Sequence, residues 1–175
     1  MTGIRRIVTA HDDQGRSIVQ FDDGGTNRLD SQSFPGLVMH ELWATAEMPA
    51  RPAGGVDRAL RRIRIEPERH GSVFRVIELP PDDMSAAVDH RAADAEFGLS
   101  AQSERARIER HRTMHRTLTL DYLVVLSGEM WMLLDDSEVL LTPGTCVIQQ
   151  ATAHGFSNRS NDYCVFAAVL IEARP

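Results

Sequence analysis

The chain of 175 residues is 42% hydrophobic and 25% charged, which suits a single globular domain large enough to bury its own core. Its 25 acidic residues outnumber its 19 basic ones, all arginine, and the formal net charge of -6 excludes a general attraction to nucleic-acid phosphates. No apolar run approaches the roughly 20 residues that span a bilayer, and residues 1–6 lack the layout of a signal peptide, so we expect a cytoplasmic protein without nucleic-acid or membrane partners.

The first 80 residues contain short apolar or β-branched runs separated by Asp-Asp, Gly-Gly, Pro-Ala and Pro-Pro breakers, a pattern typical of strands and turns. The strands predicted here are residues 4–9, 17–21, 38–43 and 72–79. From Pro81 to Arg112 the chain is rich in Ala, Glu, Arg and Asp without alternation. We expect one or two short helices in this segment, placed to cover the mouth of a barrel.

The C-terminal part is dense in predicted strands, bounded by turn residues such as Ser127-Gly128 and Pro143-Gly144. These strands are expected at residues 117–126, 130–134, 138–141, 146–150 and 164–171. Short strands recurring about every 8 to 12 residues favour a sandwich or barrel over an alternating α/β fold. The sequence therefore predicts one all-β domain over residues 1–175, with N-terminal strands and an arm in 1–80, a helical insertion in 81–111 and the barrel core in 112–174.

The two cysteines, Cys146 and Cys164, are each flanked by apolar residues in strand-like runs. Free cysteine is among the residue types most often buried. Two small buried side chains are therefore favoured over a redox pair or a zinc site.

Residues capable of chemistry gather in the strand that begins at His115. Because side chains alternate across a strand, His115, Thr117 and Asp121 share one face. Burying an unpaired carboxylate is costly, so Asp121 needs a cation, a proton or hydrogen-bond donors nearby. A metal ion held by imidazole and carboxylate groups is one arrangement that meets this need.

This strand resembles the first motif of the cupin superfamily, which reads His, any residue, His, three or four residues, Glu, six residues, Gly. His115 takes the first histidine position, and Thr117 stands where the second histidine belongs. Asp121 replaces the glutamate, and Gly128 follows after six residues.

The second cupin motif is matched in part by Pro143-Gly144 and the residues that follow. Gln149 and Ala151 stand where proline and glycine belong, whereas His154 and Asn158 are correctly spaced. The chain looks like a cupin-2-like subgroup of mostly unassigned bacterial and fungal proteins, whose members typically have Gln-Arg-Gly-Thr before this histidine and a tryptophan two residues after it. Here Gln-Gln-Ala-Thr precedes the histidine and Phe156 follows it.

The resemblance covers nearly the whole chain apart from about residues 81–111, and it implies a double-stranded β-helix or jelly-roll barrel. It also implies that His115, Asp121 and His154 converge on one divalent metal ion and act as the catalytic groups. Two histidines and one carboxylate leave positions open for water or substrate, as in facial-triad iron sites, and three protein ligands also suit zinc. Iron or zinc is therefore the expected cofactor, with manganese or nickel as alternatives. Proteins of this family commonly pair through N-terminal strands, which implies a homodimer.

Further residues are candidates for contacting a small-molecule substrate. They are Arg75, Thr117, Gln149, Phe156 and Trp131. Arg75 and Gln149 suit a carboxylate or carbonyl group. Phe156 and Trp131 are expected in the barrel wall, where they would also touch a ligand.

These assignments have structural alternatives. His115 and His154 would be hydrogen-bonded core residues in a barrel that has lost its metal. Asp121 would then be held by a turn backbone, or by Arg75 or Arg112. His111 has the parity of a fourth ligand, although an exposed polar side chain is the favoured interpretation.

A metal ion with open positions polarises a carbonyl, acidifies the adjacent C–H bond and stabilises the resulting enolate. The leading hypothesis is an enzyme of specialised metabolism that catalyses a lyase-type reaction on a small oxygenated metabolite: dehydration, decarboxylation, isomerisation or cyclisation. A non-heme iron dioxygenase with the same ligands is one alternative. A non-catalytic small-molecule-binding cupin is the other.

Overall fold

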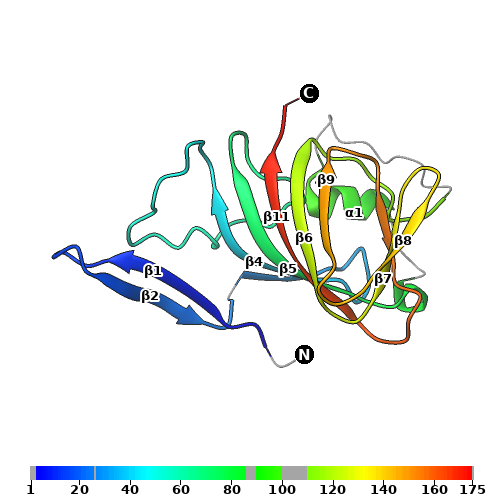
Figure 1. Cartoon of the computed structure of the whole chain (residues 1–175), viewed down its shortest axis with the longest axis horizontal. Helices are drawn as coiled ribbons and strands as arrows, with labels where there is room; N and C mark the ends of the chain where they lie inside the picture. The colour runs from blue at the N-terminus through cyan, green and yellow to red at the C-terminus, as the bar shows by residue number, and fades with distance from the viewer. Residues whose placement is uncertain (1–2, 26, 86–89, 100–109, 175) are drawn as a thin grey trace.

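The structure is a computed structural model that describes residues 3–25, 27–85, 90–99 and 110–174 (Figure 1). In chain order its elements are β1 (Arg6–His11), β2 (Ser17–Asp23), β3 (Asn27–Asp30), β4 (Val38–Thr45), β5 (Ser72–Leu79), the 3-10 helix η1 (Asp82–Ser85), α1 (His90–Phe97), β6 (Thr119–Ser127), β7 (Met130–Leu133), β8 (Glu138–Leu141), β9 (Cys146–Gln150), β10 (Gly155–Ser157) and β11 (Cys164–Glu172). The described chain is therefore mostly β, as expected.

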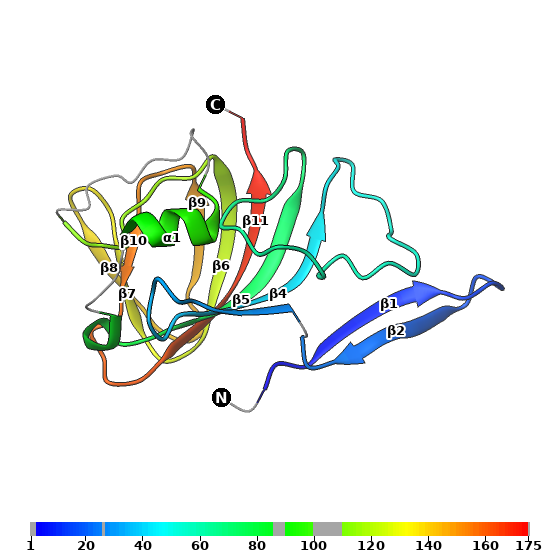
Figure 2. The same cartoon turned by 180° about the vertical axis from the view of Figure 1, so that it is seen from behind.

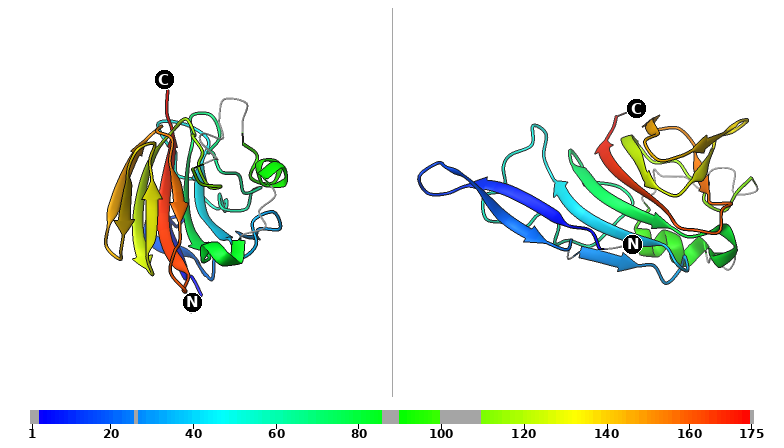
Figure 3. Two further views of the ribbon diagram at one scale, coloured as in Figure 1. Left: turned by 90° about the vertical axis from the view of Figure 1, so that its right-hand side faces the viewer. Right: turned by 60° about the horizontal axis from the view of Figure 1, so that its bottom comes forward.

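Two antiparallel sheets face each other in the barrel. The larger has six strands in the order β3-β4-β5-β11-β6-β9, and the smaller has the order β10-β7-β8. Both contribute to one hydrophobic core, whose members include Val73, Leu123, Met130, Leu141 and Phe166. The hairpin β1-β2 forms a separate sheet that projects away from the barrel (Figure 3). This is the all-β jelly-roll architecture predicted from the sequence.

A tight turn at Gly128 passes the chain from the larger sheet to the smaller one. Gly128 has a φ of 71°, a conformation that costs glycine little because it has no Cβ. A Cβ at this position would lie 2.3 Å from the Tyr163 carbonyl oxygen. Only glycine therefore fits in the turn between β6 and β7.

Strand register brings the polar candidates to one inner surface. Asp121 on β6 pairs with Gln149 on β9 and with Leu170 on β11. Ala168, two residues before Leu170, pairs with Arg75 on β5. Residues two apart on a strand point to the same face. The side chains of Arg75, Asp121 and Gln149 therefore all point to the inner face of the larger sheet.

Most predicted strands are present with small shifts at their ends, and β3 and β10 are additional. The predicted insertion contains η1 and α1, whereas a second helix near its end would fall on residues 100–109, outside the described part. Cys164 is buried as expected, but the prediction for Cys146 was wrong because this residue is exposed at the start of the edge strand β9. In the described ranges, no helix has the length and hydropathy needed to cross a membrane.

Candidate active site

The inner surface encloses a cavity of about 140 Å³. Most of its lining is apolar, and it includes Phe34 and Leu37 before β4 and Phe97 at the end of α1. Figure 2 shows α1 in front of the strands whose inner residues line this space. A dry cavity of about 150 Å³ holds a molecule the size of benzene, so a single ring fits without rearrangement.

Two histidines lie in contact at the cavity wall. His115 and His154 form a two-residue β-bridge, with N–O distances of 2.9 and 3.0 Å, and their ring centroids are 4.5 Å apart. The Nδ1 of His115 lies 2.7 Å from the Thr113 carbonyl, and the Nδ1 of His154 lies 2.9 Å from the Thr152 carbonyl. A carbonyl only accepts, so each Nδ1 carries hydrogen, and the lone pair of a neutral ring is on Nε2.

His154 is neutral over the physiological range. Burial, with the positive charge of His115 as a second cause, lowers the pKa of His154 to about 3. A neutral imidazole accepts hydrogen bonds or binds a metal through Nε2. His154 therefore supplies a lone pair to the cavity, and it has no proton to donate from Nε2.

Asp121 is a buried carboxylate with unmet hydrogen-bonding capacity. It is 5% exposed, and its Oδ1 has no hydrogen-bond partner among the described residues. Burial raises the pKa of Asp121 to about 6, against the opposing effects of a hydrogen bond with Thr119 and the positive charge of Arg75. Arg75 thus acts on Asp121 through its charge, while its ion pair is with Glu41.

Arg75 places a buried cation in the same cavity. Its side chain pairs with Glu41 at 3.0 Å and donates to the Arg64 carbonyl at 2.6 Å. Its Nε has no hydrogen-bond partner in the described structure. Glu41 also pairs with Arg61 at 3.0 Å, so these contacts fix the guanidinium while one donor remains unused.

The three predicted metal ligands share the cavity wall without forming a compact cluster. Within the described ranges, no three His, Cys, Asp or Glu side chains lie close enough together to hold one ion. Asp121 pairs with Gln149 across the β6-β9 ladder. Its side chain is one methylene shorter than the glutamate of the cupin motif. The donor chemistry of the two anchored imidazoles suits a divalent ion, whereas the position of Asp121 in this structure does not complete the set.

Comparison with known proteins identifies the family, although no family model matches the chain. The chain is 41% identical over 173 residues to phomopsin biosynthesis cluster protein C' of Diaporthe leptostromiformis, covering 97% of this chain and 79% of that protein. It is 28% identical over 166 residues to a cupin-domain-containing oxidoreductase of Hypocrea virens, covering 89% of this chain and 69% of that protein. The chain belongs to the cupin superfamily. Among solved structures, this cupin is similar to the polyketide cyclase RemF of Streptomyces resistomycificus, with a TM-score of 0.46 and 18% identity, over 85% of this chain and 75% of that chain.

In this cupin, Arg75, Thr117, Gln149 and Phe156 line the cavity together with the predicted catalytic residues. Thr117 is buried and lies 2.8 Å, between hydroxyl oxygens, from Thr119. Trp131 is not among the cavity-lining residues in the described part of the chain, and its ring lies beneath the Arg159 guanidinium, 4.9 Å from centroid to carbon. The structure therefore does not support a direct substrate contact for Trp131.

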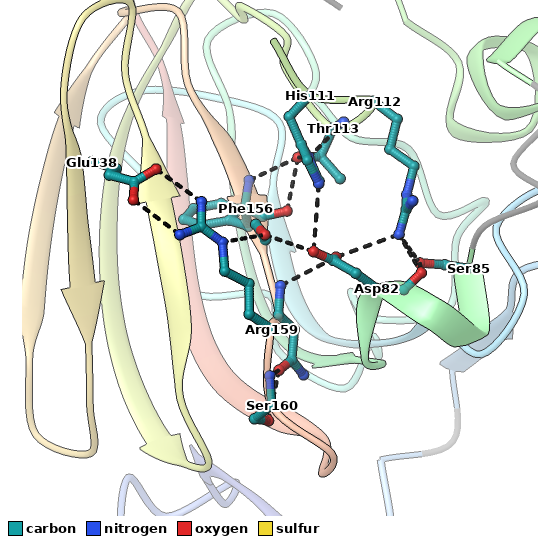
Figure 4. Close-up of polar contacts among 11 residues, drawn as sticks. Asp82, Ser85, His111, Arg112, Thr113, Glu138, Phe156, Arg159 and Ser160 are labelled. Carbon is teal, nitrogen blue, oxygen red and sulfur yellow. Dashed lines mark hydrogen bonds and ion pairs between the residues drawn. The ribbon is translucent and has the colours of Figure 1, made fainter.

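The favoured interpretation of His111 was also wrong. Its side chain is 17% exposed, and it lies between Asp82 and Thr113 (Figure 4). Among the described residues, Thr113 lines the cavity and Asp82 does not. Neither residue carries a clear signal in the sequence: Asp82 follows two prolines and is typical of a turn, and Thr113 belongs to no cupin motif.

Proposed function

We propose that this cupin is an enzyme of specialised metabolism that acts on a small, mainly apolar molecule carrying an oxygen function. The observation that carries the proposal is a pair of buried polar atoms without hydrogen-bond partners in the described ranges, the donor Arg75 Nε and the acceptor Asp121 Oδ1, on two residues that line one apolar cavity. Leaving buried donors and acceptors unsatisfied is costly. A ligand that offers an oxygen to Arg75 and a hydrogen to Asp121 removes both costs.

The reaction that these residues support is of the lyase type. The Asp121 carboxylate takes a proton from the carbon beside a substrate carbonyl, the C–H bond breaks, and its electron pair forms an enolate. The charged Arg75 guanidinium stabilises the enolate oxygen. In a dehydration, the enolate then expels hydroxide from the next carbon, and protonated Asp121 supplies the proton that makes it water. In an isomerisation, Asp121 returns the proton to a different carbon.

The metal-dependent form of the proposal places one divalent ion, iron or zinc with manganese or nickel as alternatives, on His115 and His154. Such an ion would polarise the same carbonyl as a Lewis acid. Both rings are anchored through Nδ1, which suits ligation through Nε2. Asp121 completes the predicted three-ligand set only if its side chain moves toward the two rings.

An iron-dependent oxygenase is the second candidate function. Two relatives, from Hypocrea virens and Aspergillus ruber, carry the name cupin-domain-containing oxidoreductase. The same histidine pair would serve this reaction, which consumes molecular oxygen. Oxygen uptake therefore separates the two candidates.

Hydrogen exchange in D₂O tests the lyase proposal directly. A panel of aryl β-hydroxy ketones is incubated with protein loaded in turn with each of the four metals, and exchange of the hydrogens beside the carbonyl is followed by NMR. We expect exchange or water loss with the native chain and at least about a hundredfold less with Asp121→Asn, because a positioned base contributes about 10²–10⁴-fold. Oxygen uptake without exchange would favour the oxygenase. Ligand binding without either would favour a binding protein and overturn the enzyme assignment.

A further inference from the structure

The carboxylate of Asp82 joins three segments of the chain (Figure 4). It accepts hydrogen bonds from the Ser157 hydroxyl at 2.6 Å and from the Asn158 backbone N–H at 3.2 Å. Arg112 donates to it at 3.4 Å, and Nε2 of His111 lies 3.6 Å from Oδ2. Asp82 therefore ties η1 to the segment that precedes His115 and to the end of β10.

His111 extends this network to Thr113. The Nδ1 of His111 lies 2.8 Å from the Thr113 hydroxyl oxygen, which also lies 2.8 Å from both the N and the O of Phe156. The Phe156 carbonyl only accepts, so the single Thr113 hydroxyl hydrogen goes to it. The Phe156 N–H donates to the Thr113 oxygen, and the Thr113 backbone N–H donates to Nδ1 of His111 at 3.3 Å. Thr113 is therefore joined both to His111 and to the segment that follows His154.

Thr113 contacts both segments that carry the histidine pair. Its carbonyl accepts from Nδ1 of His115 at 2.7 Å, while its hydroxyl is bonded to the backbone two residues beyond His154. The two segments are close because Gly155 has no side chain: a Cβ there would lie 2.8 Å from the Thr113 hydroxyl and 2.9 Å from the Met114 sulfur. A change at Thr113 is therefore transmitted to both rings.

We propose that Asp82, His111 and Thr113 are positioning residues that fix the orientation of the His115 and His154 rings relative to each other. This inference deepens the proposed function, because a reaction on the histidine pair requires the two rings to be held in one arrangement. Thr113 acts at the contact between the strands, and Asp82 acts through His111.

Histidine NMR on the metal-free protein tests the role of Thr113 without any substrate. In ¹⁵N-histidine protein, long-range ¹H–¹⁵N spectra report which ring nitrogen carries the proton. We expect Nδ1–H rings at both positions in the native chain and in Thr113→Ser, and mixed tautomers at His115 in Thr113→Val. Thr152→Val is the matched control, because Thr152 also lies two residues before a site histidine, contributes its carbonyl and has an exposed side chain.

A second pair of variants tests the far end of the network. Asp82→Asn keeps the side-chain shape and removes the charge, and we expect it to mix the His115 tautomers as well. Ser85→Ala is its control, because the buried Ser85 hydroxyl accepts from Arg112 at 2.7 Å without contacting His111. Cobalt(II) titration is the second readout: Thr113→Val and Asp82→Asn should bind it about 10- to 100-fold more weakly, the effect typical of lost ligand-orienting bonds.

Native-like histidine spectra in folded Thr113→Val and Asp82→Asn would overturn the positioning role. Equal disturbance by Thr152→Val and Ser85→Ala would also overturn it, since the effect would then be general loosening. Altered tautomers in a protein that shows no exchange, oxygen uptake or cobalt binding would support positioning while the proposed function fails. The histidine spectra therefore test the positioning role, whereas exchange, oxygen uptake and cobalt binding test the proposed function.

Discussion

Asp121 is ionised less readily in the folded protein than in the unfolded chain, because burial raises its pKa from 3.8 to about 6. Folding therefore favours the protonated form. The folded state loses stability as the pH rises from about 4 to about 6, and the full cost is present above that range. This cost is the physical reason for expecting a function at this residue, since a structural site would avoid it.

Replacing the carboxylate should therefore stabilise the metal-free protein. Asp121→Asn is expected to raise the free energy of unfolding by up to about 3 kcal/mol near pH 8 and by less than about 1 kcal/mol near pH 4. Urea unfolding at both pH values measures the difference, with the exposed Asp136→Asn as a control. A gain that is the same at both pH values would contradict the raised pKa.

Arg75 and Glu41 should behave as a coupled buried pair. Arg75→Met leaves Glu41, which is 0% exposed, with Arg61 as its remaining cationic partner, and breaking such a pair typically costs about 3–5 kcal/mol. The double variant Arg75→Met/Glu41→Gln should cost less than the sum of the two single changes. Chemical unfolding of all four proteins measures the coupling, and additive effects would argue against it.

Thr117 offers a direct test of the predicted metal site. It lines the cavity at the position of the second motif histidine, so Thr117→His adds an imidazole beside the existing pair. We expect at least about tenfold tighter zinc binding, equivalent to about 1.4 kcal/mol, measured by competition with a chelating dye. Thr117→Asn is the control of similar size, and equal affinity in both variants would place the bound zinc elsewhere.

The strands that carry the cupin motifs could be predicted from the sequence because alternation and turn residues are clear there. The predicted face is confirmed for β6 and the residues just before it: Thr117, Thr119 and Asp121 are buried, whereas Arg116 and Tyr122 are exposed. The strand β10 was missed because three residues, Gly155–Ser157, are too few to show a period. Alternation predicts which face of the sheet a side chain points to, but it does not predict which side chains from other segments contact it.

The contacts of Trp131 and His111 show this limit at the site. Trp131 was expected to touch a ligand from the barrel wall, but Arg159 from the loop after β10 covers its ring. His111 was favoured as an exposed residue, but Asp82, distant in sequence, lies beside it. Both contacts depend on loop packing, which has no local signal in the sequence.

Close packing between β10 and the segment before His115 leads to a prediction about Gly155. Gly155→Ala would bring a Cβ within 2.9 Å of Met114 and of Thr113, and overpacking of this kind costs about 1–3 kcal/mol. We expect that loss in urea unfolding, together with weaker cobalt binding. Gly24→Ala, where the nearest atom is 3.7 Å away, should leave both properties unchanged.

At the scale of the whole molecule, the projecting hairpin β1-β2 is the surface on which the predicted homodimer would depend. Ile7, Ile18 and Val19 on it are 53%, 42% and 58% exposed, and Phe74 and Tyr122 are exposed on the outer face of the larger sheet. Apolar surface of this kind is typical of an interface with another chain. The homodimer stays a prediction that the single chain does not test.

Analytical ultracentrifugation checks the homodimer. We expect a dimer at micromolar concentration in the native chain and a folded monomer in Ile7→Glu/Val19→Glu, because two charges in a buried apolar contact are unfavourable. Asp13→Lys, which changes an exposed charge in the turn between β1 and β2, is the control. A native monomer would contradict the prediction.

The two walls of the cavity have different origins in the chain, and this separation bears on how the protein can evolve. The polar groups His115, Asp121 and His154 come from the motif segments and Arg75 comes from β5, whereas Phe34 and Leu37 approach from a loop and Phe97 from a short helix. Loops and short helices tolerate substitution better than paired strands do. Drift in these apolar residues can therefore exchange one substrate for another while the reacting groups are inherited unchanged.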